Sequence, residues 1–282
     1  MCVSGVPAVI SGILSGMSDP LVISFDLDGV LIENPFGKGV FPWVREHVRG
    51  TATALAGLEQ AEQDALMTAT VNEEWAARMM AGDFVGAYDW DSILNVASGK
   101  LGGPAVPDIT ELVERFCRED GMIALLPGAR EGLELLRESG AVIHALTNGY
   151  RKFQLPVLEA LGIEGFFSEL VTPELTGSAK PQPGMFNAVP GLSIHVGDML
   201  VHDIYGARAA GLRTVWLNPD LPAALLELPL ASRVDFPGLD GVIEEALAAS
   251  PYARVHPEVN AQNSRPDFLV RDALEAAQAA LL

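Results

Sequence analysis

The feature that most constrains this chain is an apolar run of strand length that ends abruptly at two carboxylates. Residues 21–25 are mainly apolar, and Asp26, Leu27, Asp28 and Gly29 follow them directly. Strands buried on both faces have such continuous apolar runs, and parallel sheets bind ligands just beyond the carboxyl ends of their strands. Ionised carboxylates are costly there unless they are paired or bind a cation. The pattern is typical of either a solvent-exposed turn or a site for a metal ion or a charged substrate.

Two later segments repeat this arrangement of a strand followed by polar residues. Residues 141–146 and 192–196 have strand patterns, and they end at Thr147-Asn148-Gly149 and at Gly197-Asp198. Helical patterns separate the strands, and such alternation implies right-handed crossovers and a parallel sheet with helices on both faces. The carboxyl ends of parallel strands meet at one edge of the sheet. We therefore expect an α/β fold with a functional site at that edge.

A long segment between the first strand and this alternation has only helical patterns. From about residue 41 to residue 119, apolar residues recur at helical spacing, and glycine and proline residues separate the candidate helices. A segment of this length is too long for a plain loop. We expect a helical domain over residues 35–121, inserted into a core formed by residues 19–34 and 122–250.

The two ends of the chain fall outside this division. Residues 1–18 contain no lysine or arginine and are interrupted by glycine and proline, so they match neither a signal peptide nor a membrane span. We expect them to be a disordered extension or the product of an upstream start site. Residues 267–282 have an apolar stripe at helical spacing. We expect residues 251–282 to be a C-terminal extension with a final helix for core packing or self-association.

Composition narrows the function classes. The 282 residues include 37 acidic and 18 basic side chains, a net charge of -19, which disfavours nucleic acid and anionic membranes as partners. A small phosphorylated metabolite stays compatible, because a local metal ion and lysine can outweigh the global charge. A hydrophobic content of 49% allows a sizeable core. Cys2 and Cys117 lie far apart without metal-ligand spacing, which favours a reduced, cytoplasmic location.

Four short motifs follow one another along the chain: Asp26-Leu27-Asp28-Gly29-Val30, Thr147-Asn148-Gly149, Lys180-Pro181, and Gly197-Asp198 with Asp203. Together, in this order, they resemble the motifs of the haloacid dehalogenase (HAD) superfamily of aspartate-nucleophile enzymes. The resemblance covers residues 21–218, with the helical insertion where the family's first-type cap belongs. Val30 is a departure, because the family more often has threonine there. The resemblance implies a Rossmann-like parallel sheet core with an inserted all-helical cap domain.

The resemblance also implies a magnesium-dependent reaction through an aspartyl-phosphate. Asp26 would be the nucleophile, and Asp28 would protonate the leaving alcohol and then activate water. Magnesium would bind the Asp26 carboxylate, the main-chain carbonyl of Asp28 and the Asp198 carboxylate.

The remaining motif residues would bind the phosphate. Thr147 and the main chain around Asn148 would donate hydrogen bonds to its oxygens, Lys180 would offset its charge, and Asp203 would bind a metal-bound water or orient Lys180. Taken singly, each motif has a simpler interpretation as a strand-ending turn, a solvated lysine or a helix N-cap. His202 lacks a second histidine at ligand spacing, so we expect a hydrogen-bonding or surface role for it instead of metal binding.

Asp28 separates reaction types within the superfamily. Dehalogenase-like members lack the second aspartate, because a halide needs no proton, and ion-pumping members carry threonine there. Its presence favours phosphate-ester hydrolysis or phosphomutase chemistry, and we expect a phosphatase acting on phosphate monoesters. The alternatives are a phosphomutase and a non-catalytic protein that binds phosphate or magnesium.

The substrate depends on the cap. Its candidate leaving-group contacts are Lys38, Trp43, Arg45, Arg78, Tyr88 and Trp90. Equally, the aromatic members of this set, with Trp75, could form the core of the cap. Residues 146–181 look similar to capped nucleotidases and acylneuraminate phosphatases, which suggests a nucleoside monophosphate or a sugar phosphate, with phosphoglycolate close behind. We expect a monomer or a homodimer.

Overall fold

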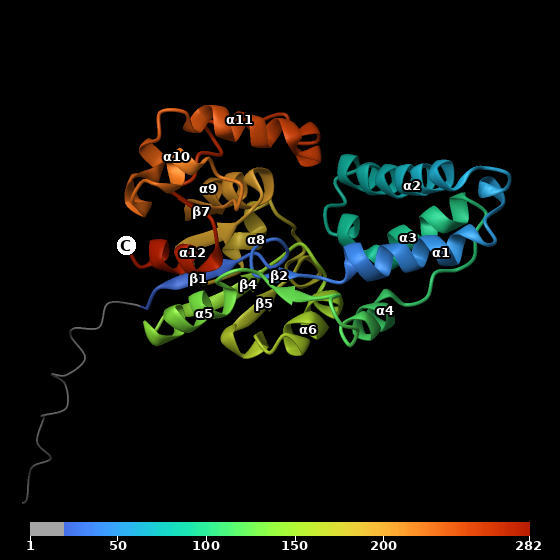
Figure 1. Cartoon of the computed structure of the whole chain (residues 1–282), viewed down its shortest axis with the longest axis horizontal. Helices are drawn as coiled ribbons and strands as arrows, with labels where there is room; N and C mark the ends of the chain where they lie inside the picture. Colours follow the sequence, from blue (N-terminus) through green and yellow to red (C-terminus); the bar gives the residue numbers. More distant parts are fainter. Residues whose placement is uncertain (1–19) are drawn as a thin grey trace, which may run out of the picture.

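A six-stranded parallel sheet forms the centre of the structure, a computed structural model that describes residues 20–282 (Figure 1). Its strand order is β5-β4-β1-β6-β7-β8. The strands are β1 (Val22–Phe25), β4 (Val142–Leu146), β5 (Glu169–Val171), β6 (Ile194–Gly197), β7 (Arg213–Leu217) and β8 (Phe268–Val270). Every neighbouring pair is parallel. The predicted α/β class with a Rossmann-like parallel sheet is confirmed.

The position of β1 explains why the polar strand ends meet. It lies between β4 and β6, and Phe25 pairs with Ala145 on one side and with Val196 on the other. The residue after Phe25 therefore lies level with the ends of both neighbouring strands. The hydrogen bond from the Asp26 amide to the Val196 carbonyl, 2.8 Å long, extends this register by one residue.

Helices cover both faces of the sheet. Ile23 and Phe25 pack in one apolar cluster with α5 (Ala129–Glu138) and α12 (Ala273–Ala280). Val22 and Leu146 pack in another with α8 (Pro183–Asn187) and α9 (Gly206–Ala209). The other elements of this part are α6 (Arg151–Ala160), η4 (Glu164–Phe166), α7 (Pro173–Thr176), η5 (Leu200–Tyr205), α10 (Ala223–Leu226), η6 (Leu230–Asp235), α11 (Leu239–Ala249) and η7 (Pro251–Arg254).

The segment between β2 (Ile32–Glu33) and β3 (Ala124–Leu125) contains helices and no strand. It holds η1 (Phe36–Val40), α1 (Phe41–Arg49), η2 (Thr53–Leu55), α2 (Gln60–Met80), η3 (Gly86–Tyr88), α3 (Trp90–Lys100) and α4 (Ile109–Phe116). The two short strands pair antiparallel, which brings the start and the end of the segment together. Figure 1 shows α1, α2 and α3 beside the sheet rather than on either of its faces.

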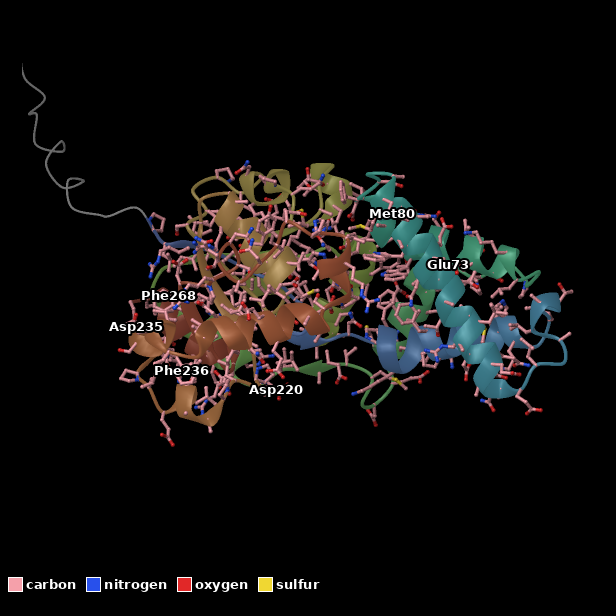
Figure 2. The ribbon with its side chains drawn as sticks, turned by 90° about the horizontal axis from the view of Figure 1, so that it is seen from above. Glu73, Met80, Asp220, Asp235, Phe236 and Phe268 are labelled. Atoms are coloured by element: carbon pink, nitrogen blue, oxygen red, sulfur yellow. The ribbon has the colours of Figure 1, made fainter. Side chains whose placement is uncertain are left out.

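Local sequence signals set the limits of these helices. Glu59 and Glu62 form a reciprocal capping box at the start of α2, and the Asp89 side chain accepts a hydrogen bond from the Ser92 amide at the start of α3. Gly82, with a φ of 77°, follows the end of α2. In Figure 2, α2 extends away from the sheet, with Met80 at the end nearer to it. None of the helices within residues 20–282 combines the length and apolar composition that crossing a membrane requires.

The prediction for the C-terminal residues is wrong in one respect. Residues 267–282 do not form one helix, and residues 251–282 are not an extension outside the core: residues 268–270 form β8, which pairs with β7, and only then does α12 begin. Leu269 and Val270 are fully buried in the sheet. Three consecutive apolar residues fit a buried strand as well as a helix, so periodicity alone misleads here. The prediction for residues 1–18 lies outside the described residues.

The packing of α12 on α5 gives a test of this arrangement. A Cβ added to Gly132 in α5 would meet the Ala273 carbonyl oxygen at 2.5 Å, and both groups belong to helix backbones that cannot yield cheaply. We expect Gly132→Ala to lower the free energy of unfolding by about 1–3 kcal/mol in urea titrations.

The matched control is Gly241→Ala in α11, where an added Cβ would meet nothing within 4 Å. Alanine is the better helix former, so this change should raise the free energy of unfolding by about 0.5–1 kcal/mol. Equal effects of the two substitutions would contradict close packing of α12 on α5.

Candidate active site

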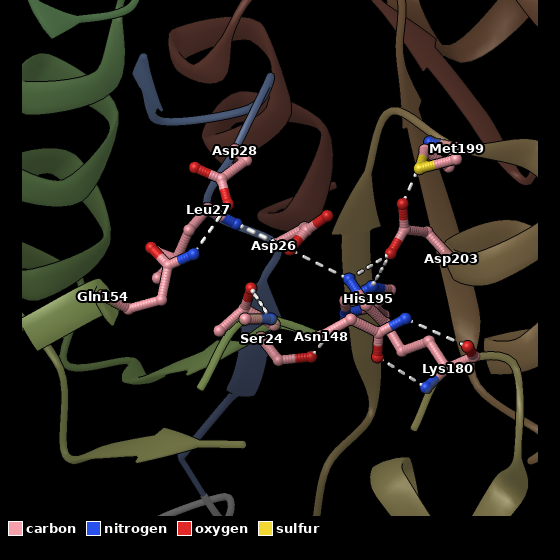
Figure 3. Close-up of polar contacts among 12 residues, drawn as sticks. Ser24, Asp26, Leu27, Asp28, Asn148, Gln154, Lys180, His195, Met199 and Asp203 are labelled. Carbon is pink, nitrogen blue, oxygen red and sulfur yellow. Dashed lines mark hydrogen bonds and ion pairs between the residues drawn. The ribbon is translucent and has the colours of Figure 1, made fainter. Parts of the chain in front are cut away.

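The residues predicted for the site come together at the carboxyl ends of β1, β4 and β6 (Figure 3). A cavity of about 330 Å³ lies there, lined among others by Asp26, Asp28, Thr147, Asn148 and Lys180. The carboxylates of Asp26, Asp198 and Asp203 offer oxygens that lie within 4.8 Å of one another. The sequence motifs therefore identify side chains that the fold places in one site, although they are up to 177 residues apart (203 minus 26).

Lys180 holds the centre of the site. Its ammonium lies 2.6 Å from Asp203 Oδ1 and 2.9 Å from Asp26 Oδ1, and the residue is only 2% exposed. Burial lowers the pKa of Lys180, but the charges of Asp203 and Asp26 raise it by more, to above its ordinary value. The lysine is therefore a buried, permanently charged group with two carboxylate partners.

Asn148 fixes the main chain of this lysine. The Asn148 side chain accepts a hydrogen bond of 2.7 Å from the Lys180 amide and donates one of 3.0 Å to the Lys180 carbonyl. These two hydrogen bonds fix the side-chain amide, and its second N–H, like the main chain at Asn148, remains available as a donor. Thr147 is buried, and its hydroxyl accepts a hydrogen bond of 3.1 Å from the Gly149 amide. That hydroxyl keeps its own proton for donation into the cavity.

Asp203 connects Lys180 to two residues that the sequence motifs did not reveal. Its Oδ1 also lies 3.1 Å from His195 Nε2, and the other ring nitrogen of His195 lies 2.7 Å from the Ser24 hydroxyl. Asp203 Oδ2 accepts a hydrogen bond of 2.9 Å from the Met199 amide. Burial raises the pKa of Asp203, but Lys180 and His195 lower it by more, to below its ordinary value.

These contacts favour one of the two roles expected for Asp203. Both of its oxygens are engaged by protein donors, which fits orientation of Lys180 better than contact with a metal-bound water. A usable signal for the missed partners is present in the sequence. Ser24 is the only polar residue within the first apolar strand, and His195 occupies a similar place in the strand that ends at Gly197.

Asp198 has the opposite environment. Its Oδ1 is buried without a hydrogen-bond partner among residues 20–282. Burial, followed by the charges of Asp203 and Asp26, raises the pKa of Asp198 well above its ordinary value. Gly29, with a φ of 82°, allows this approach, because an added Cβ would lie 2.5 Å from Asp198 Oδ2. A buried carboxylate oxygen without a donor, beside a second carboxylate, fits a hard divalent cation.

Asp28 has two amide donors. Its Oδ1 accepts a hydrogen bond of 2.5 Å from Asn34, and its Oδ2 accepts one of 2.7 Å from Gln154. Burial, followed by the charge of Asp26, raises the pKa of Asp28 to about 6. Sequence reasoning missed both donors. Gln154 lies among the buried apolar residues of α6, and a polar residue at such a position is the signal that could have indicated it.

The inserted segment supplies part of the cavity wall. Of the six cap residues considered from sequence, Tyr88 and Trp90 line the cavity, whereas Lys38, Trp43, Arg45 and Arg78 do not. Lys38 pairs with Glu33, and Arg78 binds Glu74, the Gly86 carbonyl and Ser92.

Of the two roles expected for His202, the surface role is wrong, because the residue is only 3% exposed. The hydrogen-bonding role stays a prediction, since its Nε2 has no hydrogen-bond partner in the described part of the chain. Its neighbours are mainly rings, and it lines the cavity. Burial lowers the pKa of His202 to about 3, so the imidazole is neutral at physiological pH.

Comparison with known proteins identifies the family. A family model for haloacid dehalogenase-like hydrolases matches residues 21–211. The phosphoglycolate phosphatase of Haemophilus influenzae is 30% identical over 207 residues, which cover 70% of this chain and 85% of that protein. The glyceraldehyde 3-phosphate phosphatase of Pyrococcus furiosus is 35% identical over 100 residues, which cover 33% of this chain and 42% of that protein.

A solved structure has the same fold. The HAD phosphatase from Thermococcus onnurineus is 22% identical and aligns with a TM-score of 0.53 over 72% of this chain and 88% of that chain. At this identity the similarity is one of fold alone. The family match itself covers more than half of the chain and includes all the motif residues. The chain therefore belongs to the haloacid dehalogenase-like hydrolases, which confirms the resemblance predicted from the four motifs.

The Lys180 ion pairs lead to a test on stability. Replacing Lys180 with Met leaves the buried carboxylates of Asp26 and Asp203 without their cation, so the free energy of unfolding at pH 7 should fall by about 3–5 kcal/mol in urea titrations. The loss should shrink as the pH falls, because protonation of these carboxylates in the variant removes the unpaired buried charge.

Lys152→Met is the control for this substitution. The Lys152 ammonium also pairs with a carboxylate, that of Asp91, but its side chain is 44% exposed. An exposed pair contributes at most about 1 kcal/mol, so this variant should remain close to the wild type. Similar losses for Lys152→Met and Lys180→Met would contradict a charged Lys180 at the centre of the site.

Proposed function

We propose that this chain is a magnesium-dependent phosphatase that hydrolyses the monoester of a small phosphorylated metabolite through an aspartyl-phosphate on Asp26. The observation that carries the proposal is the environment of Asp28, a second carboxylate beside Asp26, whose pKa burial and the Asp26 charge raise to about 6. Such a group exists in both protonation states near neutral pH, so it can give a proton to a leaving alcohol and later take one from water. Hydrolysis of an alkyl phosphate needs this exchange, whereas release of a halide does not.

Asp26 is oriented for attack on phosphorus. The contacts that hold its carboxylate within the described chain, from the Leu27 amide at 2.8 Å and Lys180 at 2.9 Å, both involve Oδ1. The second oxygen remains for the reaction. In the first step an Asp26 oxygen bonds to phosphorus, the bond from phosphorus to the ester oxygen breaks, and Asp28 protonates that oxygen. In the second step Asp28 takes a proton from water, whose oxygen displaces Asp26 from phosphorus.

Phosphate binding would use the groups beside Asp26. Lys180 neutralises part of the phosphate charge, and the Thr147 hydroxyl and the main chain at Asn148 donate to its oxygens. Among residues 20–282, Lys180 is the only permanently charged cation paired with Asp26 and Asp203, and the Asp198 carboxylate lies beside them, so this part of the site has an excess of negative charge. Magnesium bound by Asp26, Asp198 and the Asp28 carbonyl would offset that excess and polarise the phosphate.

The metal site can be tested without an activity assay. Magnesium that binds only the folded protein stabilises it, by about 2.7 kcal/mol at a concentration 100-fold above the dissociation constant. We expect magnesium to raise the melting temperature of the wild type and to have little effect on Asp198→Asn. Asp235→Asn is the control, since Asp235 is an exposed carboxylate at the far end of the molecule (Figure 2), and it should respond like the wild type. An undiminished response of Asp198→Asn would refute the proposed site.

The reaction itself is tested by phosphate release from a panel of phosphorylated metabolites, with and without magnesium. We expect turnover by the wild type and none by Asp26→Asn. Asp28→Asn should lose about 100-fold or more in steady-state turnover, because hydrolysis of the aspartyl-phosphate needs Asp28 with every ester. With p-nitrophenyl phosphate, whose leaving group needs no proton, the variant should still release a first equivalent of p-nitrophenol, whereas with alkyl esters this first step is lost as well. The proposal would be contradicted if neither the wild type nor Asp26→Asn released phosphate from any ester of the panel. Conversion of a sugar 1-phosphate to an isomeric ester, instead of free phosphate, would indicate a mutase.

The substrate is proposed at the level of class. A nucleoside monophosphate, a sugar phosphate and phosphoglycolate all carry the monoester that the Asp26 and Asp28 pair requires. The relatives named for phosphoglycolate and glyceraldehyde 3-phosphate agree with a small phosphorylated metabolite in general. A cytoplasmic location and a monomeric or homodimeric state remain part of this proposal.

A further inference from the structure

A segment beyond the family match reaches the cavity. The match ends at residue 211, and residues 218–267 lie between β7 and β8. Tyr252 in η7 lines the cavity, and its ring lies 4.3 Å from that of His202 in η5 and 5.3 Å from that of Trp75 in α2. Tyr252 therefore lies between the inserted helices and the sheet, at the wall of the site.

The same wall contains two buried polar atoms that lack partners. His202 Nε2 makes no hydrogen bond with the described residues, although the side chain is only 3% exposed. The Tyr88 hydroxyl, in a side chain that is 8% exposed, lies beside the Asn148 side chain but makes no hydrogen bond of standard geometry within residues 20–282. A buried polar group without a hydrogen bond lowers the free energy of unfolding by about 1–3 kcal/mol, so such groups in a native protein usually have a bound partner. Both side chains line the cavity, and their rings lie 6.4 Å apart. A ligand in the cavity can supply the missing hydrogen bonds.

The cavity offers no free cation. Among its lining residues, all of which the structure describes, Lys180 is the only permanently charged cation, and it is already paired with Asp26 and Asp203. His202 is neutral, as described above. A carboxylate on the leaving group would therefore be desolvated beside Asp26 and Asp28 without compensation. The rest of the wall combines the aromatic side chains of Phe36, Phe41, Trp90 and Phe153 with neutral polar side chains, none of which carries a positive charge.

We propose that Tyr88, His202 and Tyr252 form a leaving-group subsite that selects phosphate esters of uncharged, hydroxyl-bearing alcohols over esters of alcohols that carry a carboxylate. The hydroxyl of Tyr88 and the ring nitrogen of His202 bind hydroxyl or carbonyl groups, and the rings contact the carbon face of a sugar or a base. The inference rests on the proposed phosphatase activity. Overall similarity does not decide this question, because one relative is named for the carboxylate phosphoglycolate and another for the uncharged glyceraldehyde 3-phosphate.

A matched pair of substrates tests the selection in the wild type. Glycerol 3-phosphate and 3-phosphoglycerate differ by a carboxylate in place of a hydroxymethyl group. We expect kcat/KM to favour glycerol 3-phosphate by about tenfold or more, since a site without a counterion rejects the added charge. An equal or reversed preference would overturn the inference. Ribose 5-phosphate and uridine 5′-monophosphate show whether a free sugar or a nucleoside is the better uncharged leaving group. A higher kcat/KM for either of them than for 3-phosphoglycerate supports the inference.

Variants of Tyr252 test the wall itself. Tyr252→Ala should raise KM for the preferred uncharged ester by about 5- to 50-fold, while the inhibition constant of inorganic phosphate stays unchanged. Tyr252→Arg supplies the missing cation, so it should shift the ratio of kcat/KM values towards 3-phosphoglycerate by about tenfold. Arg254→Ala is the control, because Arg254 is exposed on the same turn and does not line the cavity. Unchanged ratios in both Tyr252 variants would contradict the inference.

The outcomes separate this inference from the phosphatase proposal. If the wild type releases no phosphate from any ester, including p-nitrophenyl phosphate, the phosphatase proposal fails and the inference fails with it. If p-nitrophenyl phosphate is hydrolysed but the matched pair is used equally, only the inference fails. Tyr252→Phe keeps the aromatic ring and is the control for misfolding of the other Tyr252 variants. It should retain most of the preference for glycerol 3-phosphate.

Discussion

The buried charge of Lys180 is the interaction on which the rest of the site depends. A buried ammonium is tolerated only when it is paired, and Asp203 and Asp26 both pair with it. Asp203 is in turn held by His195 and the Met199 amide, so the lysine has little freedom to move. One lysine cannot neutralise three clustered carboxylates. The remaining negative charge falls on Asp198 and Asp26, where a divalent cation and a phosphate can both be accommodated.

The groups proposed for chemistry and those proposed for selection come from different parts of the chain. The former follow the strands of the sheet, whereas the cavity wall above them combines Tyr88 of the inserted segment, His202 of the core and Tyr252 of the segment before β8. The inserted segment is also tied to the core directly, since the Tyr150 hydroxyl donates to the Val85 carbonyl at 3.1 Å. Because of this separation, substitutions in the cavity wall can alter the contacts with the leaving group without altering the residues at the strand ends.

Sequence reasoning succeeded where a local pattern and the geometry of a parallel sheet act together. An apolar strand followed by polar residues is visible in the sequence, and the parallel register brings such ends together. It failed for Gln154 and His195, because a hydrogen bond between residues far apart in the sequence leaves no periodic trace, and for Asn34, because a turn next to the strand does not show which side chain it turns inward. Gln154, for example, is 126 residues from Asp28. It also failed for β8, because three apolar residues have no period that separates a strand from a helix.

The sequence by itself determined the family, the parallel α/β core, the helical insertion and which side chains meet at the sheet edge, because each depends on a local pattern or a motif. Only the tertiary structure decided the electrostatic state of those side chains. Asp203 and Asp198 are the same residue type five positions apart, yet one has a lowered pKa and the other a raised one. The difference arises from Lys180 and His195, which reach Asp203 and leave Asp198 Oδ1 buried without a donor among the residues that the structure describes. Burial and partners are properties of the fold, and no local pattern encodes them.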